Sequence, residues 1–296
     1  MPSPGLAPDY DSPTALKQLL EAEGLAMSKR FGQNFLISRG ARQRVLAELA
    51  LSAELSLSAA PSPSIWEIGP GLGSMTALAL EAGIAVTAFE IDHGFARLLR
   101  RFFEGRPGFE LVEGDFIDTW AARLAAGPAP DRIFGNLPYS AANAIVAALI
   151  EGGLLPPRMV FTVQKEAALR MAAKPGSKDY SAFSVLCTSA CKVRLAFDLG
   201  AASFWPRPNV TSTVVVMTPR PEPVAADDRR GFSTFVRAAF SSRRKTLKNN
   251  LRAAGRSEEE VAATLQALGI RPDVRAEALS PEELAAVYGR LRAGSA

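Results

Sequence analysis

The sequence predicts an α/β fold, in which a doubly wound and mostly parallel sheet is followed by a small all-helical C-terminal domain. From residue 64 to about residue 218, short apolar segments with the composition of strands alternate with helical segments. This alternation is typical of a parallel sheet with helices on its faces. Beyond the proline-rich stretch Pro219–Pro223 only helical periodicity remains. Because proline cannot continue a sheet, we expect a linker there.

The composition narrows the class of protein. The chain has 296 residues, of which 48% are apolar, enough for the core of one large domain and one smaller domain. It has no apolar run as long as a membrane span and no secretory signal at its start, so we expect a cytoplasmic protein that does not enter a membrane. One histidine and two cysteines argue against a zinc site and histidine-based catalysis, and we expect no metal. The net charge of +4 is compatible with a polyanionic partner.

Residues 1–27 are predicted to form an N-terminal arm with one short helix. Ser12 and Pro13 are the start signal of this helix, and Gly24 marks its end. The next stretch, Lys29–Leu36, combines two cations, two aromatic rings and two amides around a glycine. It is either a connection packed on the following domain or a lid over a cofactor, with its cations near nucleic-acid phosphate.

Residues 28–219 are predicted to form the α/β domain. Its expected strands are residues 64–68, 84–89, 109–112, 132–135, 159–163, 192–199 and 212–218. Its expected helices are residues 39–50, 74–82, 93–103, 116–125, 141–151, 165–172 and 181–191. Consecutive units of this kind place the carboxyl ends of neighbouring parallel strands at one edge of the sheet, where ligands bind.

Residues 220–296 are predicted to form the small helical domain. Its most regular apolar residues fall on one helical stripe. They are Val236, Phe240, Leu247 and Leu251. The sequence Ser280–Glu283 has a serine cap, a proline in the first turn and a glutamate three residues after the cap, which predicts the start of the last helix.

Three successive strand ends carry glycines or carboxylates. Gly69, Gly71 and Gly73 follow the first strand and let a ligand approach the backbone near a helix N-terminus. Glu90 ends the second strand, where a carboxylate can accept two ribose hydroxyls. Asp115 follows the third strand, where a carboxylate can accept an adenine amino group. Together they indicate a nucleoside cofactor, although a glycine-rich turn alone also serves tight strand–helix packing.

The spacing of the glycines distinguishes between cofactors. Nicotinamide dinucleotides are usually bound by G-x-G-x-x-G. Here the glycines follow G-x-G-x-G, and Glu67 precedes them at the end of the strand. This arrangement resembles the S-adenosylmethionine-dependent methyltransferases of Rossmann-like fold.

The strand at residues 132–135 leads into Asn136-Leu137-Pro138-Tyr139. The Asn136 side-chain oxygen and the Leu137 carbonyl are suited to hold the N–H groups of an exocyclic amine, and Pro138 fixes the loop without adding a donor. Tyr139 offers a face on which a base can stack. Phe204, in a second aromatic segment, is a candidate for the other face of an extruded base. Each segment by itself also fits an ordinary turn.

The chain is similar to the bacterial 16S ribosomal RNA adenine dimethyltransferases over most of its length. The motifs that carry the resemblance are Gly32–Leu36, Glu67–Gly73, Asn136–Tyr139, Val163–Glu166, Lys174–Tyr180, Phe204–Val210 and Arg243–Leu247. It implies dimethylation of N6 on two adjacent adenosines near the 3′ end of 16S rRNA, in the 30S subunit or its precursor, and we expect a monomer. The residues that it assigns to the S-adenosylmethionine pocket are Asn34, Leu36, Gly69, Glu90, Asp115 and Asn136. Those that it assigns to the base-holding site are Asn136, Pro138, Tyr139 and Phe204.

The chain departs from the family pattern at two places. Ser140–Asn143 stands where the family usually has an Asn-Ile-Ser type of sequence, and Thr211–Thr213 stands where it commonly has Asp-Ser. The first departure leaves open how the base pocket is lined.

The densest basic run lies in the helical domain. It contains Arg243, Arg244, Lys245 and Lys248. Such a run is often only a solvated helix face, but the resemblance favours contact with rRNA phosphates. Lys29, Arg30 and Arg207 are expected to extend the same surface.

Three other functions fit parts of these patterns. A 23S rRNA methyltransferase of the erythromycin-resistance type shares the chemistry, although Leu137 and residues 163–180 favour the small-subunit enzyme. A non-catalytic assembly or transcription factor would keep the fold, but the intact Asn136, Pro138 and Tyr139 argue against it. A Rossmann dehydrogenase is the third alternative.

Overall fold

The computed structural model describes residues 7–25, 34–50 and 63–293. The chain forms two compact units, each built from several stretches. The first unit comprises Met1–Ile145, Pro156–Lys165 and Leu195–Met217. The second unit comprises Val146–Leu155, Glu166–Arg194 and Thr218–Ala296. The domain boundaries predicted from the sequence, near residues 27 and 220, stay predictions.

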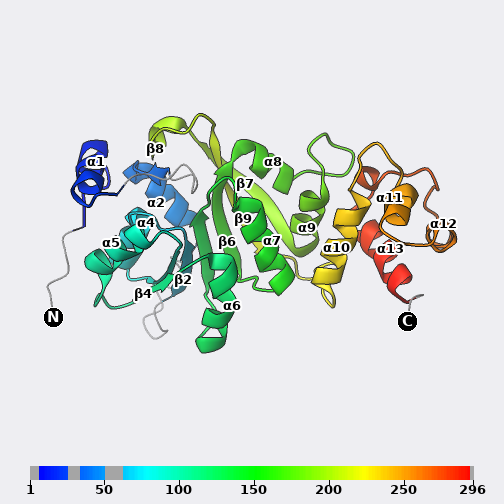
Figure 1. Ribbon diagram of the computed structural model, residues 1–296, viewed down its shortest axis with the longest axis horizontal. Helices are drawn as coiled ribbons and strands as arrows, with labels where there is room; N and C mark the ends of the chain where they lie inside the picture. The colour runs from blue at the N-terminus through cyan, green and yellow to red at the C-terminus, as the bar shows by residue number, and fades with distance from the viewer. Residues whose placement is uncertain (1–6, 26–33, 51–62, 294–296) are drawn as a thin grey trace. The chain divides into compact units, whose positions relative to one another are not determined.

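Seven strands of the described ranges form one sheet in the order β4-β3-β2-β5-β6-β9-β7 (Figure 1). They are β2 (Ser64–Ile68), β3 (Ala85–Glu90), β4 (Phe109–Glu113), β5 (Arg132–Asn136), β6 (Arg158–Gln164), β7 (Cys191–Leu199) and β9 (Ser212–Pro219). Strands β2, β3, β4, β5 and β6 pair with one another in parallel, and β9 pairs antiparallel to β6. All seven strands fall where the sequence predicted them, within one or two residues.

Two further strands, which the sequence analysis missed, pair with each other. They are β1 (Phe35–Leu36) and β8 (Phe204–Trp205), and they form an antiparallel ribbon in which Leu36 lies opposite Phe204. Two residues are too few to show a strand periodicity. The ribbon joins the segment before the helix at residues 39–48 to the aromatic segment that contains Phe204, which is predicted to hold the base.

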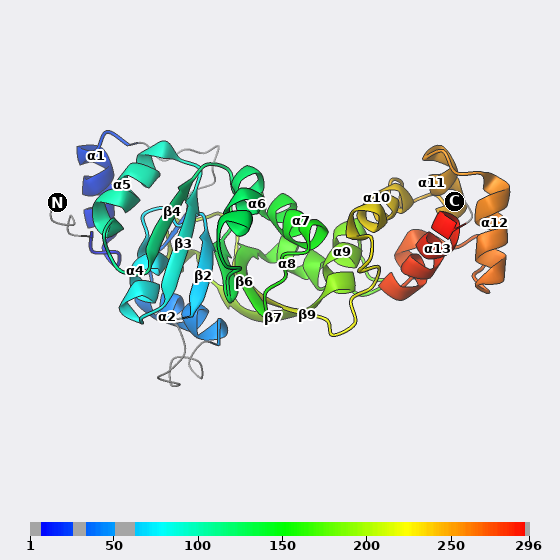
Figure 2. The same cartoon turned by 90° about the horizontal axis from the view of Figure 1, so that it is seen from below.

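Helices connect the strands (Figures 1 and 2). Those of the first part of the chain are α1 (Pro13–Ala22), α2 (Arg39–Glu48), α4 (Ser74–Glu81), α5 (His93–Phe103), α6 (Phe116–Ala126) and α7 (Ala142–Gly152). Those that follow are α8 (Lys165–Met171), α9 (Ala182–Ala190), α10 (Arg229–Ala239), α11 (Leu247–Ala253), α12 (Glu258–Ala267) and α13 (Pro281–Ala293). Within the described residues there are also two short 3₁₀ turns, η2 (Ala201–Ser203) and η3 (Ala276–Ala278). No helix in the described part of the chain has the length and apolarity needed to cross a membrane.

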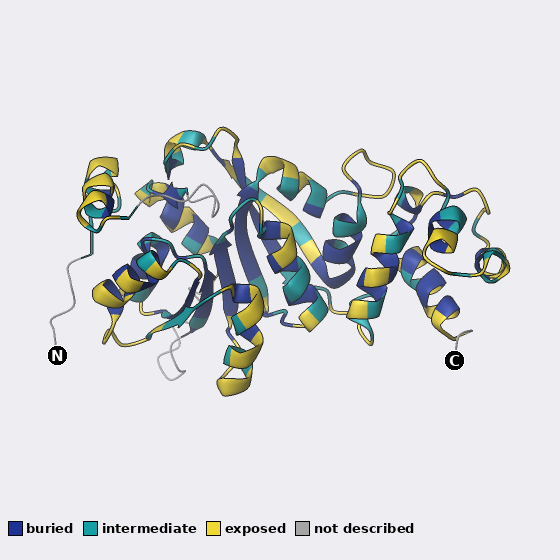
Figure 3. Cartoon of the chain, viewed as in Figure 1, coloured by how far each residue is buried: buried dark blue, intermediate teal, exposed yellow. Residues whose placement is uncertain are grey.

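The core of the first unit lies between the sheet and its helices. Strand residues such as Ile65 and Ala88 pack with Val45 of α2 and Ala79 of α4. Because side chains alternate along a strand, Trp66 points to the opposite face. There it contacts Phe89 (ring centroids 4.9 Å apart), which in turn contacts Phe116 of α6. The five inner strands are therefore mostly buried, whereas the edge strands β4 and β7 and the outer faces of the helices are more exposed (Figure 3).

Helix α1 begins where predicted and packs into this unit. The Ser12 hydroxyl accepts a hydrogen bond from the Ala15 amide, and Pro13 occupies the first turn. Leu16 and Leu20 are buried in a cluster with Phe95 and Leu99 of α5. The described N-terminal segment, residues 7–25, is thus anchored to the first unit by a second hydrophobic cluster.

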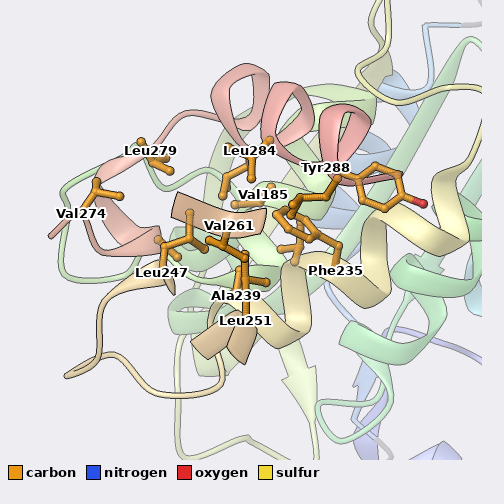
Figure 4. Close-up of a cluster of buried hydrophobic side chains, with 14 of the residues drawn as sticks. Val185, Phe235, Ala239, Leu247, Leu251, Val261, Val274, Leu279, Leu284 and Tyr288 are labelled. Atoms are coloured by element: carbon orange, nitrogen blue, oxygen red, sulfur yellow. The ribbon is translucent and has the colours of Figure 1, made fainter. Parts of the chain in front are cut away.

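The second unit has its own helical core (Figure 4). Its members include Val185 of α9, Val236 of α10, Leu247 of α11 and Leu284 of α13. The prediction of one continuous helical stripe over residues 236–251 was wrong, because α10 ends at Ala239 and α11 begins at Leu247. The Thr246 hydroxyl caps the new helix by accepting the Asn249 amide hydrogen.

The last helix confirms the predicted start signal. The Ser280 hydroxyl accepts a hydrogen bond from the Glu283 amide, and the Glu283 carboxylate accepts one from the Ser280 amide. This reciprocal pair satisfies two backbone donors at the start of α13.

Candidate active site

The glycine-rich turn between β2 and α4 brings the backbone close to its neighbours. Gly71 and Gly73 have φ angles of +58° and +83°, a region that glycine adopts without steric cost. A Cβ on Gly71 would lie 2.8 Å from the Phe35 ring, and one on Gly73 would lie 2.5 Å from the Phe103 ring. Glycine is therefore required at both positions. The amides of the first turn of α4 face the same carboxyl edge of the sheet.

Glu90 ends β3 beside this turn. One carboxylate oxygen accepts a hydrogen bond from the Gly71 amide and the other from the Asp92 amide, both at 2.9 Å. The side chain is only 4% exposed, and burial raises the pKa of Glu90 to about 7. A carboxylate offers about four acceptor positions, so this one retains capacity for two hydroxyl donors.

Glu67 is a second buried carboxyl in the same cleft. It accepts a hydrogen bond of 2.6 Å from the Thr76 hydroxyl. Burial, aided by the charge of Glu90, raises the pKa of Glu67 to about 7. Two carboxyls in one cleft favour a positively charged ligand. The sequence analysis noted Glu67 in the motif but left it out of the predicted site.

Asn136 stands at the end of β5, the strand next to β2. Its side-chain amide nitrogen donates a hydrogen bond of 2.7 Å to the main-chain carbonyl of Asn34. With the nitrogen engaged there, the side-chain oxygen Oδ1 is the acceptor end of the amide, and no described residue donates a hydrogen bond to it. In the register of the sheet Gly135 lies opposite Ile68, which places Asn136 beside the glycine-rich turn.

The three residues after Asn136 are held by separate contacts. The Leu137 amide donates to the Thr162 carbonyl at 3.1 Å, and no described residue donates a hydrogen bond to the Leu137 carbonyl. The Pro138 carbonyl accepts the amides that begin α7. The Tyr139 hydroxyl lies 3.0 Å from the Ser212 hydroxyl. The loop is thus fixed while one main-chain acceptor stays available.

One cleft collects most of the predicted site. It lies in the first unit, at the carboxyl edge of the sheet. Its lining includes the predicted residues Asn34, Leu36, Gly69, Gly71, Glu90, Asn136 and Pro138. Its other lining residues are Phe35, Glu67, Pro70, Ser74, Met75, Ile91, Phe95 and Phe134. Most of the residues predicted to bind the methyl donor therefore lie in one cleft with the strand-end Asn136.

Four residues of the predicted catalytic and cofactor sites do not line this cleft: Leu137 and Tyr139, in the loop described above, and Asp115 and Phe204. Asp115 is exposed at the start of α6, where its carboxylate accepts the Ile117 amide hydrogen at 2.8 Å. Phe204 is 1% exposed and belongs to the core around β1 and β8. Its ring has no face open to a base in this arrangement. Their roles in binding adenine and in stacking stay predictions.

The cleft also contains residues that the sequence analysis missed. Ile91 follows Glu90 and is 41% exposed, so it offers an apolar surface at the mouth of the cleft. Phe35 lies edge-on to Phe95 and stacks with Trp205, at centroid distances of 5.5 and 6.2 Å. An exposed apolar residue directly after a strand-end carboxylate is the signal that would have identified Ile91.

The predicted cations differ in their environment. In the second unit, Arg243 pairs with Glu277 and Lys248 pairs with Glu258, each at 2.9 Å. Arg244 and Lys245 are exposed, and no described residue forms an ion pair with either. In the first unit Arg207 is exposed. Lys29 and Arg30 lie outside the described residues.

The fold and the cleft define a class of protein. The parallel sheet, the positive-φ glycine turn and the buried strand-end Glu90 are the features of a nucleoside-binding Rossmann-like domain. The two carboxyls and the close backbone approach fit S-adenosylmethionine, whose sulfonium is positive. Within the described residues, no cluster of three or more His, Cys, Asp or Glu side chains is arranged to hold a metal ion. The class is therefore that of the S-adenosylmethionine-dependent methyltransferases.

Comparison with known proteins identifies the family. A model of the ribosomal RNA adenine dimethylase family matches residues 24–292, and the chain belongs to that family. A ribosomal RNA small subunit methyltransferase A of Treponema denticola is 42% identical over 92% of each chain. The protein of the same name from Treponema pallidum is 39% identical over 97% of this chain and 98% of its own. The predicted family, enzyme class and methyl donor are confirmed.

Two solved structures share the fold. A dimethyladenosine transferase from Plasmodium falciparum has a TM-score of 0.67 and 22% identity, covering 84% of this chain and 94% of its own. The 23S rRNA methyltransferase ErmE has a TM-score of 0.57 and 24% identity, covering 86% and 98%. The predicted α/β fold with C-terminal helices is confirmed.

Proposed function

We propose that the protein transfers methyl groups from S-adenosylmethionine to the N6 amines of two adjacent adenosines near the 3′ end of 16S rRNA. The substrate is the 30S subunit or its precursor, and the enzyme acts as a monomer in the cytoplasm. The observation that carries this proposal is Asn136, whose amide is oriented by Asn34 in the cleft that contains Glu90. The names of the relatives support a small-subunit substrate.

The donor half of the site consists of the glycine turn and the strand-end carboxyls. Glu90 accepts the ribose hydroxyls with its remaining lone pairs, while Gly69 and Gly71 leave room at the backbone. Leu36 and the Asn34 backbone form the wall toward the N-terminal segment. Asp115 accepts the adenine amino group from the end of the next strand. Ile91 adds an apolar contact at the mouth.

The acceptor half consists of two oxygens. When bound, S-adenosylmethionine supplies a methyl group already activated on a sulfonium. Asn136 Oδ1 and the Leu137 carbonyl accept the two N6–H hydrogen bonds, so that the nitrogen becomes more pyramidal and its lone pair is exposed. A nitrogen–carbon bond forms as the carbon–sulfur bond breaks, and the amine proton passes to water. The reaction depends on positioning of the adenine amine and on stabilisation of the charge that develops on it, so no strong base is needed.

The base is held between aromatic residues. Tyr139 stacks on one face of the extruded adenine, and its hydroxyl is anchored by Ser212. Phe204 covers the other face once the β1–β8 ribbon shifts, because its ring is buried in the present arrangement. Pro138 fixes the loop between the two acceptors and Tyr139.

The cations hold the RNA backbone. Arg244 and Lys245 are the strongest candidates, because they are exposed without an acidic partner among the described residues. Arg243 and Lys248 contribute to RNA binding when each leaves its glutamate partner and pairs with an RNA phosphate instead. Lys29, Arg30 and Arg207 are further cations that we assign to RNA phosphates.

Methyl transfer from labelled S-adenosylmethionine to unmethylated particles tests the proposal. Purified 30S and 50S particles are incubated separately with the protein, and label is measured in each rRNA. We expect label in 16S rRNA only. Label confined to 23S rRNA would instead indicate an enzyme of the erythromycin-resistance type, and no label in either would indicate a non-catalytic factor. A parallel binding titration with NAD and S-adenosylmethionine separates the dehydrogenase alternative.

A further inference from the structure

Arg42 is a buried cation that no part of the proposed chemistry uses. It lies on α2 and is only 5% exposed. Burying a guanidinium costs free energy unless its N–H groups are paired. A buried arginine therefore depends on partners that use its geometry. In Arg42 both terminal nitrogens have such partners, while the buried Nε has none among the described residues.

The hydrogen-bond partners of Arg42 are the backbone at the end of β1 and just after it, and one acidic residue. Its Nη1 donates to the main-chain carbonyls of Leu36 and Ile37, at 3.2 and 2.8 Å. Its Nη2 donates to the Asp11 carboxylate at 2.7 Å. The rigid planar fork of arginine can reach all three acceptors at once, which the single ammonium of lysine does less well.

The strand held in this way forms a wall of the cofactor cleft. Leu36 lines the cleft, and its carbonyl accepts a second hydrogen bond, 3.3 Å long, from the hydroxyl of Ser74, another cleft residue. The neighbouring Phe35 ring lies against the glycine turn, where it leaves no room for a Cβ on Gly71. A shift of this strand would therefore change the shape of the cleft directly.

Within the described residues few other backbone hydrogen bonds hold β1, although the Phe35 and Leu36 side chains are buried. Its two residues pair with the two residues of β8, and the following Ile37 amide donates to the Ser203 carbonyl at 2.9 Å. So short a ribbon is marginal without side-chain support. Asp11 precedes α1, and α1 packs on α5 through Leu16 and Leu20. The contact from Asp11 to Arg42 thus links the N-terminal segment to the cleft wall.

We propose that Arg42 is a positioning residue for the cofactor, and that Asp11 holds it in place, so that the N-terminal segment is a part of the S-adenosylmethionine site. This inference rests on the proposed function and adds a role for residues outside the cleft. Neither side chain touches the reacting atoms. Their effect is on the affinity for the cofactor, through the Leu36 and Ile37 backbone.

The test compares cofactor binding and turnover in matched variants of the full chain. Arg42→Lys keeps the charge but loses the fork, and we expect the calorimetric Kd for S-adenosylmethionine to rise about tenfold while kcat at saturating cofactor changes less than about twofold. Asp11→Asn should raise the Kd by about threefold. The double variant should bind the cofactor no more weakly than Arg42→Lys, because Asp11 acts only through its contact with the Arg42 guanidinium.

Arg44→Lys is the control. Arg44 lies on the same helix but is exposed, and its guanidinium stacks 3.8 Å from the centre of the Phe197 ring. Its Kd should equal that of the wild type. Thermal unfolding of each variant shows whether it folds, and Asp11→Asn provides the test if Arg42→Lys does not.

Three outcomes would overturn the inference. In the first, Arg42→Lys and Asp11→Asn bind the cofactor like the wild type. In the second, kcat and the unfolding midpoint fall while the Kd is unchanged, which would make Arg42 a support of the fold alone. If either of these results is obtained while the wild type binds S-adenosylmethionine and transfers methyl groups, only the inference on Arg42 fails. In the third, the wild type neither binds S-adenosylmethionine nor transfers methyl groups, and the proposed function fails with it.

Discussion

The side-chain amide of Asn136 donates a hydrogen bond of 2.7 Å to the main-chain carbonyl of Asn34, a residue 102 positions earlier in the chain. This bond joins the end of β5 to the segment that continues into β1. It also fixes which end of the Asn136 amide is free to accept a hydrogen bond. The proposed acceptor of the adenine amine is thereby oriented by the wall of the donor site.

Tyr139 allows the ring and the hydroxyl to be separated. Tyr139→Phe loses only the contact with Ser212, and we expect less than about a fivefold loss in kcat/KM. Tyr139→Ala removes the stacking surface, and kcat/KM should fall about 30-fold, in line with the measured contribution of base stacking. Steady-state kinetics on 30S particles distinguishes the two. Equal losses in both variants would contradict a stacking role.

The pKa of Glu90, raised to about 7 by burial, predicts pH-dependent cofactor binding. Only the deprotonated carboxylate can accept two ribose hydroxyls, so the affinity should rise with pH through this pKa. Between pH 6 and 8 the Kd for S-adenosylmethionine should fall about tenfold. Glu90→Gln should bind more weakly and lose most of this dependence. Calorimetric titrations at several pH values make the comparison, and a wild-type Kd that is independent of pH would exclude this role.

Glu67 predicts a pH dependence of stability in the absence of cofactor. Its pKa is raised to about 7 in the fold, above the value of an exposed glutamate. The stabilisation that it contributes is therefore fully present below the unfolded-state pKa and is lost as the pH rises through 7. Between pH 5 and pH 8 the free energy of unfolding should decrease in the wild type. In Glu67→Gln we expect this decrease to be smaller by about 2 kcal/mol.

Urea denaturation at each pH measures this difference. Gln keeps an oxygen that can accept the Thr76 hydroxyl, so the variant isolates the charge. Parallel stability curves for the two proteins would show that Glu67 titrates normally.

The salt dependence of RNA binding distinguishes the cations of the second unit. Arg244→Ala combined with Lys245→Ala should lower the slope of log Kobs against log salt by about 1.5, because each free cation releases nearly one counterion. Lys248→Ala should lower it by less, because Lys248 already pairs with Glu258. Arg290→Ala, an exposed arginine of α13 outside the basic run, is the control. A slope unchanged in the double variant would remove these residues from the RNA contact.

Much of the fold could be predicted from the sequence, because long periodic segments determine it. The strand at residues 64–68 and the helix at residues 93–103 appear at the expected positions. The apolar stripe over residues 236–251 was misleading, because its periodicity continues across the break at Thr246 between two helices. The Thr246 cap supports that break, together with tertiary contacts such as the hydrogen bond from the Leu247 amide to the Val274 carbonyl.

The site could be predicted where chemistry lies at strand ends. Glu90 and Asn136 follow from that rule, and the structure brings them into one cleft. The β1–β8 ribbon and the burial of Phe204 could not be predicted, since they depend on pairing between segments almost 170 residues apart. Arg42 has no motif at all, because its partners are mostly backbone carbonyls.

The central claim is that Asn136 holds the adenine amine for methyl transfer. Mass spectrometry of nucleosides from 16S rRNA, after incubation of unmethylated 30S particles with S-adenosylmethionine, measures this most directly. With the wild type we expect dimethyladenosine at two adjacent positions. Asn136→Ala should form it about 100-fold more slowly, as expected for loss of one charge-stabilising hydrogen bond, while Asn249→Ala should match the wild type. Wild-type rates in Asn136→Ala, or no dimethyladenosine with the wild type, would contradict the claim.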